Sequence, residues 1–448
     1  MGRLFGTDGV RGIANVELTP EIALALGRAA AAALGARHQR PSVLIVRDTR
    51  RSGDLLEAAL SAGLLSAGAD VTLCGVLPTP AAAFLATDLR ADAGAVVSAS
   101  HNPAEHNGIK FFGRDGYKLT DAEEDAIEAL VGQEGEGVIG GAIGRVTTEP
   151  DAQDRYVAHA LRSLEGRRLE GLKVVVDCAH GAAYQTSPRA LAEAGAEVIA
   201  INVQPDGMNI NVECGSTYLE AVAEAVVRHQ ADVGLAHDGD ADRVLAVDAR
   251  GNAVDGDAII AILALELREQ GRLPGNAVVT TVMANLGFRL AMTNAGMDLV
   301  ETAVGDRYVI EAMRRHGAGI GGEQSGHVIL ADCSTTGDGL ITGLRLLGRM
   351  ASSGAPLAEL AKVVERYPQV LVNVPVKDRD ALPEAIGVWE AVAQIRLELG
   401  DLGRVLVRPS GTEALVRVMV EAADSVTANE AASTIVNVVL RELGEPGA

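Results

Sequence analysis

The residues best suited to chemistry lie in one short acidic segment. Asp238, Asp240 and Asp242 alternate with single residues and directly follow the apolar stretch Val233-Gly234-Leu235-Ala236. Three carboxylates at this spacing after a strand can converge on one hard cation, and Mg²⁺ suits a site that must also engage phosphate. An EF-hand fits poorly, because the sixth position of the loop holds an arginine and the twelfth holds an alanine.

Two other interpretations of the acidic segment stay open. It can be a solvated acidic turn that binds no metal. Its second half, Asp240-Ala241-Asp242-Arg243-Val244, also resembles the nucleophile motif of haloacid-dehalogenase-type phosphatases. In that case Asp240 would be an aspartyl nucleophile, and the reaction would be phosphate release.

A second candidate segment, Ser98-Ala99-Ser100-His101-Asn102-Pro103, places Ser100 beside His101 on a predicted loop. Side chains at successive positions seldom face each other, and this segment has no Gly-x-Ser-x-Gly elbow, so a hydrolase triad is disfavoured. Lys110, ten residues further on, can supply a cation or a proton-transfer group. A structural turn with a surface lysine explains the same residues.

Two further motifs suit a phosphorylated sugar. Glu323-Gln324-Ser325 can present a carboxylate and a hydroxyl to sugar hydroxyls. Arg408-Pro409-Ser410-Gly411-Thr412 resembles a phosphate cradle, with a guanidinium, two hydroxyls and backbone N–H groups at a tight turn. An ordinary surface turn is the alternative for each motif.

A threefold repeat predicts how the first three motifs are positioned. A strand, a helix, a five-residue sequence segment (the phrase), a second strand and a polar motif recur in the same order. The phrases are Ala67-Gly68-Ala69-Asp70-Val71, Ala194-Gly195-Ala196-Glu197-Val198 and Ala295-Gly296-Met297-Asp298-Leu299, and the strands that precede them are predicted at residues 43–46, 174–177 and 278–281. Each phrase is typical of a helix that ends at a left-handed glycine before a strand begins. Open parallel sheets bind ligands at strand ends, so the three motifs should lie at equivalent strand ends.

The C-terminal part of the chain has a different pattern. Residues 405–408 and 416–420 predict two paired strands around the turn at Pro409, and residues 427–443 predict a helix. The predicted fold class is therefore α/β, with three similar α/β domains that have mixed or parallel sheets and a smaller α+β C-terminal domain. We predict domains at residues 1–154, 155–254, 255–368 and 369–448.

Composition excludes several classes of function. The net charge of −21 over 448 residues disfavours nonspecific nucleic-acid binding, and an aromatic content of 3% leaves little material for base stacking. Residues 21–37 form an Ala-rich stretch that is interrupted by charges and too short to span a membrane, so it predicts a packed helix. Four cysteines without a CxxC pair predict reduced thiols and a cytoplasmic location.

Taken together, the motifs carry a resemblance to a known family. The chain resembles the α-D-phosphohexomutase superfamily, and most closely the bacterial phosphoglucosamine mutases. The resemblance runs from Leu4-Phe5-Gly6-Thr7-Asp8-Gly9-Val10-Arg11-Gly12 to the Arg408 motif, with four motifs in the family's order. It implies four domains around a central cleft, with the first three alike.

The resemblance also implies a role for each motif. Ser100 is expected to carry the transferred phosphoryl group and to bind one Mg²⁺ together with Asp238, Asp240 and Asp242. The remaining expected site residues are Arg11, His101 and Lys110 near the transferring phosphoryl group, Arg243, Glu323 and Ser325 at the sugar, and Arg408, Ser410, Gly411, Thr412 and Arg417 at the phosphate that does not react.

The implied reaction interconverts glucosamine 6-phosphate and glucosamine 1-phosphate, with glucosamine 1,6-bisphosphate or another hexose bisphosphate as primer. Gln324 and the segment Val304-Gly305-Asp306-Arg307-Tyr308 favour the glucosamine branch. A phosphomannomutase or phosphoglucomutase is the alternative within the class, and a noncatalytic sugar-phosphate-binding protein is one outside it. The chain has Ala414 where the family usually has proline, which predicts a less rigid phosphate turn. The expected partner is a phosphosugar, with no nucleic acid and no membrane, and the oligomeric state stays open.

Overall fold

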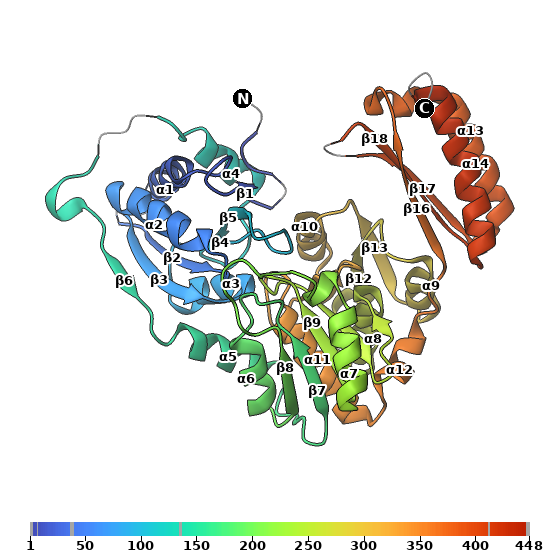
Figure 1. Cartoon of the computed structure of the whole chain (residues 1–448), viewed down its shortest axis with the longest axis horizontal. Helices are drawn as coiled ribbons and strands as arrows, with labels where there is room; N and C mark the ends of the chain where they lie inside the picture. Colours follow the sequence, from blue (N-terminus) through green and yellow to red (C-terminus); the bar gives the residue numbers. More distant parts are fainter. Residues whose placement is uncertain (1–2, 7, 36–39, 134–136, 411–412, 445–448) are drawn as a thin grey trace. The chain divides into compact units, whose positions relative to one another are not determined.

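The computed structural model describes residues 3–6, 8–35, 40–133, 137–410 and 413–444. The chain divides into two compact units. The first unit comprises Met1–Met283 and Met297–Val363, and the second comprises Ala284–Gly296 and Val364–Ala448. The first unit contains three sheets of mixed parallel and antiparallel strands, and the second contains one small antiparallel sheet (Figure 1).

The three sheets of the first unit share one core arrangement. Their central strands follow the orders β3-β2-β4-β5, β8-β7-β9-β10 and β13-β12-β14-β15. In each sheet the first three strands are parallel and the fourth is antiparallel. Strands β1, β6 and β11 extend these sheets at their edges. The predicted fold class is confirmed, with sheets that contain both parallel and antiparallel strands. The threefold repeat in the sequence corresponds to one strand arrangement that occurs three times.

The strands of the first unit are β1 (Val10–Ile13), β2 (Ser42–Arg47), β3 (Asp70–Val76), β4 (Ala93–Val97), β5 (His106–Gly113), β6 (Val146–Thr148), β7 (Lys173–Asp177), β8 (Glu197–Ile201), β9 (Val233–His237), β10 (Val244–Asp248), β11 (Ala253–Val254), β12 (Ala277–Thr281), β13 (Asp298–Thr302), β14 (Ile320–Gly322) and β15 (Val328–Leu330). The central strands are continuous apolar runs, as expected for sheets covered on both faces. In β2, for example, Val43, Leu44, Ile45 and Val46 are all at most 1% exposed.

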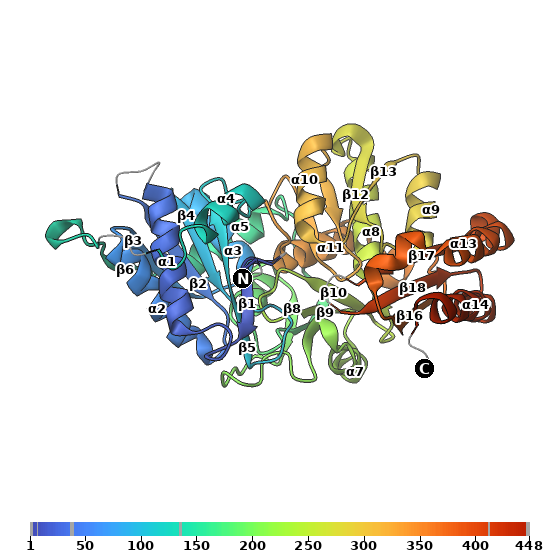
Figure 2. The same ribbon diagram turned by 90° about the horizontal axis from the view of Figure 1, so that it is seen from above.

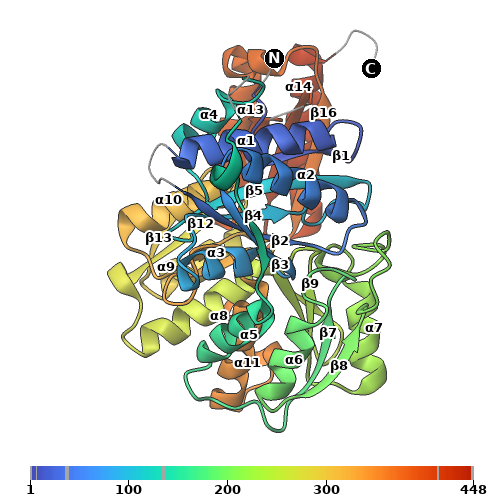
Figure 3. The ribbon, with the colours of Figure 1, turned by 90° about the vertical axis from the view of Figure 1, so that its left-hand side faces the viewer.

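The helices of the first unit are α1 (Pro20–Gly35), α2 (Ser52–Ser66), α3 (Thr79–Asp88), α4 (Asp121–Glu128), α5 (Ala152–Arg162), α6 (Thr186–Glu193), α7 (Glu220–His229), α8 (Gly256–Glu269), α10 (Asp306–His316), α11 (Gly339–Ser353) and α12 (Leu357–Leu360). Several begin at residues that cap the free N–H groups of the first turn. Thr120 and Glu123 form a capping box at α4, and Asp255 caps α8. Helix α1, predicted from the Ala-rich stretch, packs side by side with α2 (Figure 3).

The recurring phrase has the predicted conformation. Gly68, Gly195 and Gly296 have φ angles of 92°, 103° and 67°, which L-residues with a side chain rarely adopt. Each glycine ends a helix turn just before β3, β8 or β13. The polar motifs likewise occupy one equivalent place, because each joins the third parallel strand of its sheet to the antiparallel fourth strand.

The second unit has a three-stranded antiparallel sheet with the order β16-β18-β17. Its elements are α9 (Leu286–Asn294), β16 (Gln369–Pro375), α13 (Ile386–Leu399), β17 (Arg404–Pro409), β18 (Leu415–Glu421) and α14 (Ser425–Leu443). Helices α13 and α14 cover one face of the sheet (Figures 1 and 2). The predicted pairing of β17 with β18 and the predicted C-terminal helix are both present. Strand β16 and helix α13 were not predicted.

Within the described ranges, no helix is both long enough and apolar enough to cross a membrane.

Candidate active site

The acidic loop of the first unit meets the other two polar loops. The loop after β9 contacts the start of helix α3 through a hydrogen bond from the Thr79 N–H to the Asp240 carbonyl oxygen, at 2.9 Å. It contacts the third sheet through the Val244 N–H, which donates to the Gly326 carbonyl oxygen at 3.1 Å. At Gly239 a side chain would place its Cβ 2.6 Å from the carbonyl oxygen of Ser100. A glycine is therefore required where the acidic loop passes the serine loop.

Ser100 is buried and faces the acidic loop. It is 1% exposed, and its backbone has a φ of 53°, in the left-handed region. Its Oγ donates a hydrogen bond to Oδ2 of Asp238 at 2.6 Å and lies 3.4 Å from Nδ1 of His101. The hydroxyl predicted to carry the phosphoryl group is thus directed at the predicted metal ligands.

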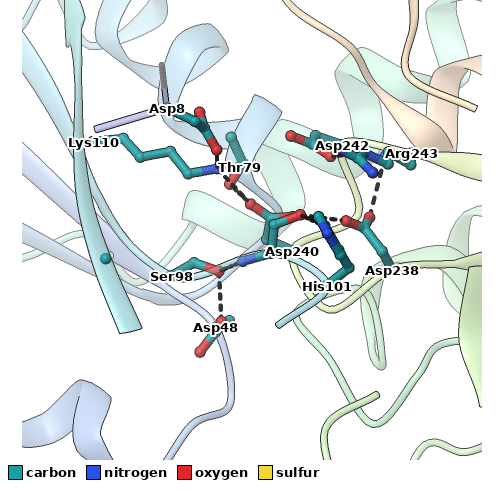
Figure 4. Close-up of polar contacts among 12 residues, drawn as sticks. Asp8, Asp48, Thr79, Ser98, His101, Lys110, Asp238, Asp240, Asp242 and Arg243 are labelled. Carbon is teal, nitrogen blue, oxygen red and sulfur yellow. Dashed lines mark hydrogen bonds and ion pairs between the residues drawn. The ribbon is translucent and has the colours of Figure 1, made fainter. Parts of the chain in front are cut away.

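The three aspartates form one buried cluster (Figure 4). One oxygen from each carboxylate lies within 4.8 Å of the others. Burial and the charges of its two neighbours raise the pKa of Asp238 well above its usual value, and burial and the charge of Asp240 raise the pKa of Asp242. Burial would also raise the pKa of Asp240, but the Lys110 ammonium lowers it below the usual value.

The donor set of this cluster fits a divalent cation. Oδ1 of Asp240 and Oδ1 of Asp242 are buried and have no hydrogen-bond partner among the described residues. Buried carboxylate oxygens without a partner are costly, and a cation that accepts oxygen ligands removes that cost. Asp238, Asp240 and Asp242 are therefore the residues that can hold Mg²⁺.

Lys110 belongs to a chain of alternating charges. Its Nζ lies 2.9 Å from Oδ2 of Asp240 and 3.0 Å from Oδ2 of Asp8. Asp8 also pairs with Arg11 and Lys118, and Lys118 pairs in turn with Asp306 at the start of α10. Burial would lower the pKa of Lys110, but Asp240 and Asp8 raise it well above its usual range. Lys110 is therefore a fixed positive charge beside the aspartate cluster.

His101 and Arg243 complete the surroundings of the cluster. Burial, together with the charge of Arg243, lowers the pKa of His101 to about 4, so its imidazole is neutral at neutral pH. Arg243 lies with its Nε 3.7 Å from Oδ1 of Asp242, and the nearby carboxylates raise its pKa despite its burial. The neighbouring imidazole of His237 is held by Ser187 Oγ and the Arg243 carbonyl oxygen.

The third loop presents its predicted sugar-binding residues with partial exposure. Oε1 of Glu323 accepts the Gly305 N–H at 3.1 Å, and Nε2 of Gln324 donates to Asp255 at 3.3 Å. Ser325 is exposed. Glu323 thereby ties this loop to the segment that begins α10.

The second unit holds the predicted phosphate turn. Arg408 on β17 lies directly opposite Arg417 on β18 in the antiparallel register. Arg408 forms no ion pair with a described residue, whereas Arg417 lies 3.6 Å from Glu413. Burial and the Arg417 guanidinium lower the pKa of Arg408. Ser410 is buried, and Gly411 and Thr412 lie outside the described residues.

Several supporting residues were missed by sequence reasoning. Thr79 donates its hydroxyl to Oδ2 of Asp240 at 2.6 Å, and Asp8 pairs with both Lys110 and Lys118. In the second unit, Arg379 donates to the Ser410 carbonyl oxygen at 2.8 Å and so holds the phosphate turn. Asp8 belongs to the N-terminal motif that carries the family resemblance, but nothing in the spacing pointed to Thr79 or Arg379.

Comparison with known protein families identifies all four parts of the chain. Models described as phosphoglucomutase/phosphomannomutase match in order: α/β/α domain I at residues 2–137, domain II at 154–251, domain III at 255–367 and the C-terminal domain at 371–438. The chain belongs to the phosphoglucomutase/phosphomannomutase family. It is therefore an isomerase that transfers a phosphoryl group intramolecularly, as the resemblance implied.

Individual members of this phosphohexomutase family match over the whole chain. A protein of Paenarthrobacter aurescens named phosphoglucosamine mutase is 56% identical, and the match covers 100% of this chain and 99% of the relative. A phosphoglucomutase/phosphomannomutase family protein of Burkholderia thailandensis has a structure with a TM-score of 0.82 at 24% identity, over 100% of this chain and 98% of that one.

A third relative has been crystallised with ligands. N-acetylphosphoglucosamine mutase of Aspergillus fumigatus, in complex with GlcNAc-6P and magnesium, has a TM-score of 0.70 at 19% identity. The match covers 97% of this chain and 95% of that one. At such identities the two structural matches show the shared phosphohexomutase fold.

Proposed function

We propose that this enzyme interconverts glucosamine 6-phosphate and glucosamine 1-phosphate through a phosphorylated Ser100 and a 1,6-bisphosphate intermediate. The observation that carries the proposal is the geometry at Ser100, whose Oγ donates to Asp238 inside a cluster of three buried carboxylates. The choice of glucosamine is supported by the relative at 56% identity, which is named phosphoglucosamine mutase.

The first transfer moves the phosphoryl group from the enzyme to the sugar. The bond between phosphorus and Ser100 Oγ breaks while phosphorus bonds to O1 of glucosamine 6-phosphate. The O1 hydroxyl loses its proton, and Ser100 Oγ gains one. After the bisphosphate has turned around, the reverse exchange takes place at O6, which restores phosphoserine and releases glucosamine 1-phosphate.

The residues around Ser100 have different roles in this transfer. Lys110 is held as an ammonium by Asp240 and Asp8, so it can stabilise phosphoryl oxygens as a fixed positive charge. His101, a neutral imidazole near Oγ, is our candidate for accepting a proton. Arg11, held by Asp8, adds positive charge on the same side.

Mg²⁺ is the metal that we assign to Asp238, Asp240 and Asp242, with phosphorylated Ser100 as a further ligand. Bound there, it would supply charge neutralisation on the phosphoryl oxygens. The two buried carboxylate oxygens without hydrogen-bond partners among the described residues support this assignment.

The other end of the substrate needs a site that accepts either phosphate. We assign this role to Arg408, Ser410 and Arg417, with Gly411 and Thr412 as sequence-based members of the same turn. Two arginines side by side form a strong phosphate site, because each guanidinium can donate two hydrogen bonds to one phosphate. Glu323, Ser325 and Arg243 are assigned to the sugar.

We propose a cytoplasmic location, and the thiols support it. All four cysteines are free, which is typical of a reducing compartment. We therefore place the enzyme in the cytoplasm.

Steady-state kinetics with three substrates test the proposed function. The enzyme, primed with a hexose bisphosphate, is given glucosamine, glucose or mannose 6-phosphate, and formation of each 1-phosphate is followed. We expect the highest kcat/KM for glucosamine 6-phosphate. A higher value for glucose or mannose 6-phosphate would assign the chain to the phosphoglucomutase/phosphomannomutase alternative, and phosphate release without isomerisation would contradict both.

A further inference from the structure

An arginine with no exposed surface lies behind the serine loop. Arg50 is 0% exposed and lies between β2 and α2. Its Nε donates to Oδ2 of Asp48 at 2.8 Å, so that its charge is balanced. Its Nη2 donates at 2.8 Å to each of two carbonyl oxygens, those of Ser100 and Asn102. Its Nη1 donates to two more carbonyl oxygens of the same loop, those of residues 103 and 106.

An asparagine from the loop that follows β8 of the second sheet binds the same pair of carbonyl oxygens. Nδ2 of Asn211 donates to the Ser100 oxygen at 3.0 Å and to the Asn102 oxygen at 3.1 Å. Asn211 lies in the segment between β8 and α7. The carbonyl oxygens of the serine loop are thus held by two donors, one from the turn after β2 and one from the loop after β8.

The backbone N–H of Ser100 is held indirectly by Asp48, the carboxylate that accepts a hydrogen bond from Arg50. The Ser100 N–H donates to Oγ of Ser98 at 3.0 Å, and Ser98 Oγ donates to Oδ2 of Asp48 at 2.5 Å (Figure 4 shows the Ser98–Asp48 contact). Both peptide groups of Ser100 are therefore fixed by the Asp48–Arg50 pair. This support holds a left-handed serine, a conformation that needs support from its surroundings.

These contacts differ from the Oγ contact in one respect. The bond from Ser100 Oγ to Asp238 needs the hydroxyl proton, so it cannot exist while Ser100 carries a phosphoryl group. The bonds to the carbonyl oxygens do not involve Oγ. They can hold the loop in the same place in the phosphorylated and unphosphorylated states, between which a mutase alternates.

We propose that Arg50 and Asn211 are positioning residues for phosphoryl transfer, which together keep Ser100 aligned in both states. The proposal rests on the proposed function. Neither residue is assigned to contact the substrate, the metal or the phosphoryl group. Their loss should therefore slow the transfer without changing how tightly the sugar phosphate binds.

The test uses single-turnover transfer from phosphoenzyme to glucosamine 6-phosphate. The full chain is phosphorylated with labelled glucose 1,6-bisphosphate and mixed with excess substrate. The amplitude of label transfer reports how many sites are folded and active, and the rate constant reports alignment. A residue needed only for folding would change the amplitude, whereas a positioning residue changes the rate constant.

Asn211→Asp is the decisive variant. It keeps the side-chain shape but brings a carboxylate oxygen near two carbonyl oxygens, while Arg50 still satisfies both of them. We expect the rate constant to fall by about 10-fold, with KM for the sugar phosphate within about 2-fold of wild type. Asn209→Ala is the matched control, because Asn209 lies two residues away and bonds only within its own loop.

Arg50→Lys should lower the rate constant of transfer further, provided that the variant folds. Lysine keeps the charge, but one ammonium cannot serve four carbonyl oxygens and Asp48, so we expect a loss of about 100-fold in the rate constant. Arg51→Lys, at the exposed neighbouring arginine, should match wild type. If Arg50→Lys enzyme does not fold, the rate constant of Asn211→Asp enzyme alone tests the positioning role.

The outcomes separate this proposal from the proposed function. Wild-type rate constants in Asn211→Asp, whatever the amplitude, would overturn the positioning role and leave the mutase function intact. Wild-type enzyme that transfers no label to glucosamine 6-phosphate would overturn the proposed function, and the positioning role with it. A slow rate constant at unchanged KM, with normal Asn209→Ala enzyme, supports the proposal.

Discussion

The two units hold their charged groups in opposite ways. Around Ser100, in the first unit, carboxylates and cations are buried and paired with one another, as in the chain from Asp240 through Lys110 to Asp8. In the second unit, Arg408 and Arg417 face each other across two strands, half-buried, with one weak acidic partner at Glu413. The first site holds acidic and basic groups together, and the second carries surplus positive charge.

The difference matches two different tasks. A site that performs chemistry benefits from groups that are fixed before the substrate arrives. A site that must release a phosphate and bind the opposite end of the same ligand benefits from cations that solvent can reach. The comparison predicts that variants at the residues around Ser100 lower turnover, whereas variants at the phosphate turn weaken binding.

The largest effect is expected from Asp242→Asn. The substitution keeps the shape of the side chain but removes a charge from the predicted metal site, so kcat should fall by about 100-fold or more. Three buried carboxylates repel one another without a cation, so the variant should have a higher Tm than wild type in EDTA. Added Mg²⁺ should raise the Tm of wild type by mass action but not that of the variant.

Asp248→Asn is the matched control for this prediction. Asp248 is also buried and acidic, on the adjacent strand β10, but it bonds to a turn at Asn252. This variant should lose some stability and keep its response to Mg²⁺. An Asp242→Asn enzyme with an unchanged Mg²⁺ dependence would contradict the metal assignment.

An intermediate effect is expected from Arg408→Ala. Because one turn must serve both ends of the sugar, KM should rise by a similar factor for glucosamine 6-phosphate and glucosamine 1-phosphate. The factor should be about 10 or more, for the loss of a charge-assisted contact of about 1.5–3 kcal/mol. Arg441→Ala, at an exposed arginine of α14, serves as control. Weakening of only one isomer would mean that the turn is not a shared phosphate site.

The smallest effect is expected from Glu413→Gln, and it has the opposite sign. Glu413 lies 3.6 Å from Arg417, and both side chains are partly exposed. Removing its charge should increase the surplus positive charge and lower KM for both sugar phosphates by up to about 2-fold, since exposed ion pairs are weak. An increase in KM would show that Glu413 orients Arg417 instead of competing for it.

Repetition made the fold of the first unit predictable. The phrases around Gly68, Gly195 and Gly296 recur with their strands, so each copy supported the others. Residues 369–448 show no such repeat, and strand β16 was missed although Val370, Val372 and Val374 alternate as a strand requires. The predicted domain boundaries stay predictions.

The site could be predicted only where chemistry-bearing residues cluster along the chain. Asp238, Asp240 and Asp242 are such a cluster. Arg50 is not, because it acts on a loop about fifty residues away, and its neighbours suggest only a turn before a helix. Asn211 lies in the loop after β8, more than a hundred residues further along the chain, so its contact with Ser100 exists only after folding.

Mapping the phosphorylated residue tests the central claim most directly. The enzyme is labelled with ³²P-glucose 1,6-bisphosphate, digested, and the label is located by mass spectrometry, with Ser100→Ala as control. The account predicts label on Ser100 alone, stable to hydroxylamine, transferred to glucosamine 6-phosphate on mixing, and absent in Ser100→Ala enzyme, which should keep the wild-type Tm to within a few degrees. Hydroxylamine-sensitive label on Asp240, or label on Ser98 with normal turnover in Ser100→Ala enzyme, would contradict it.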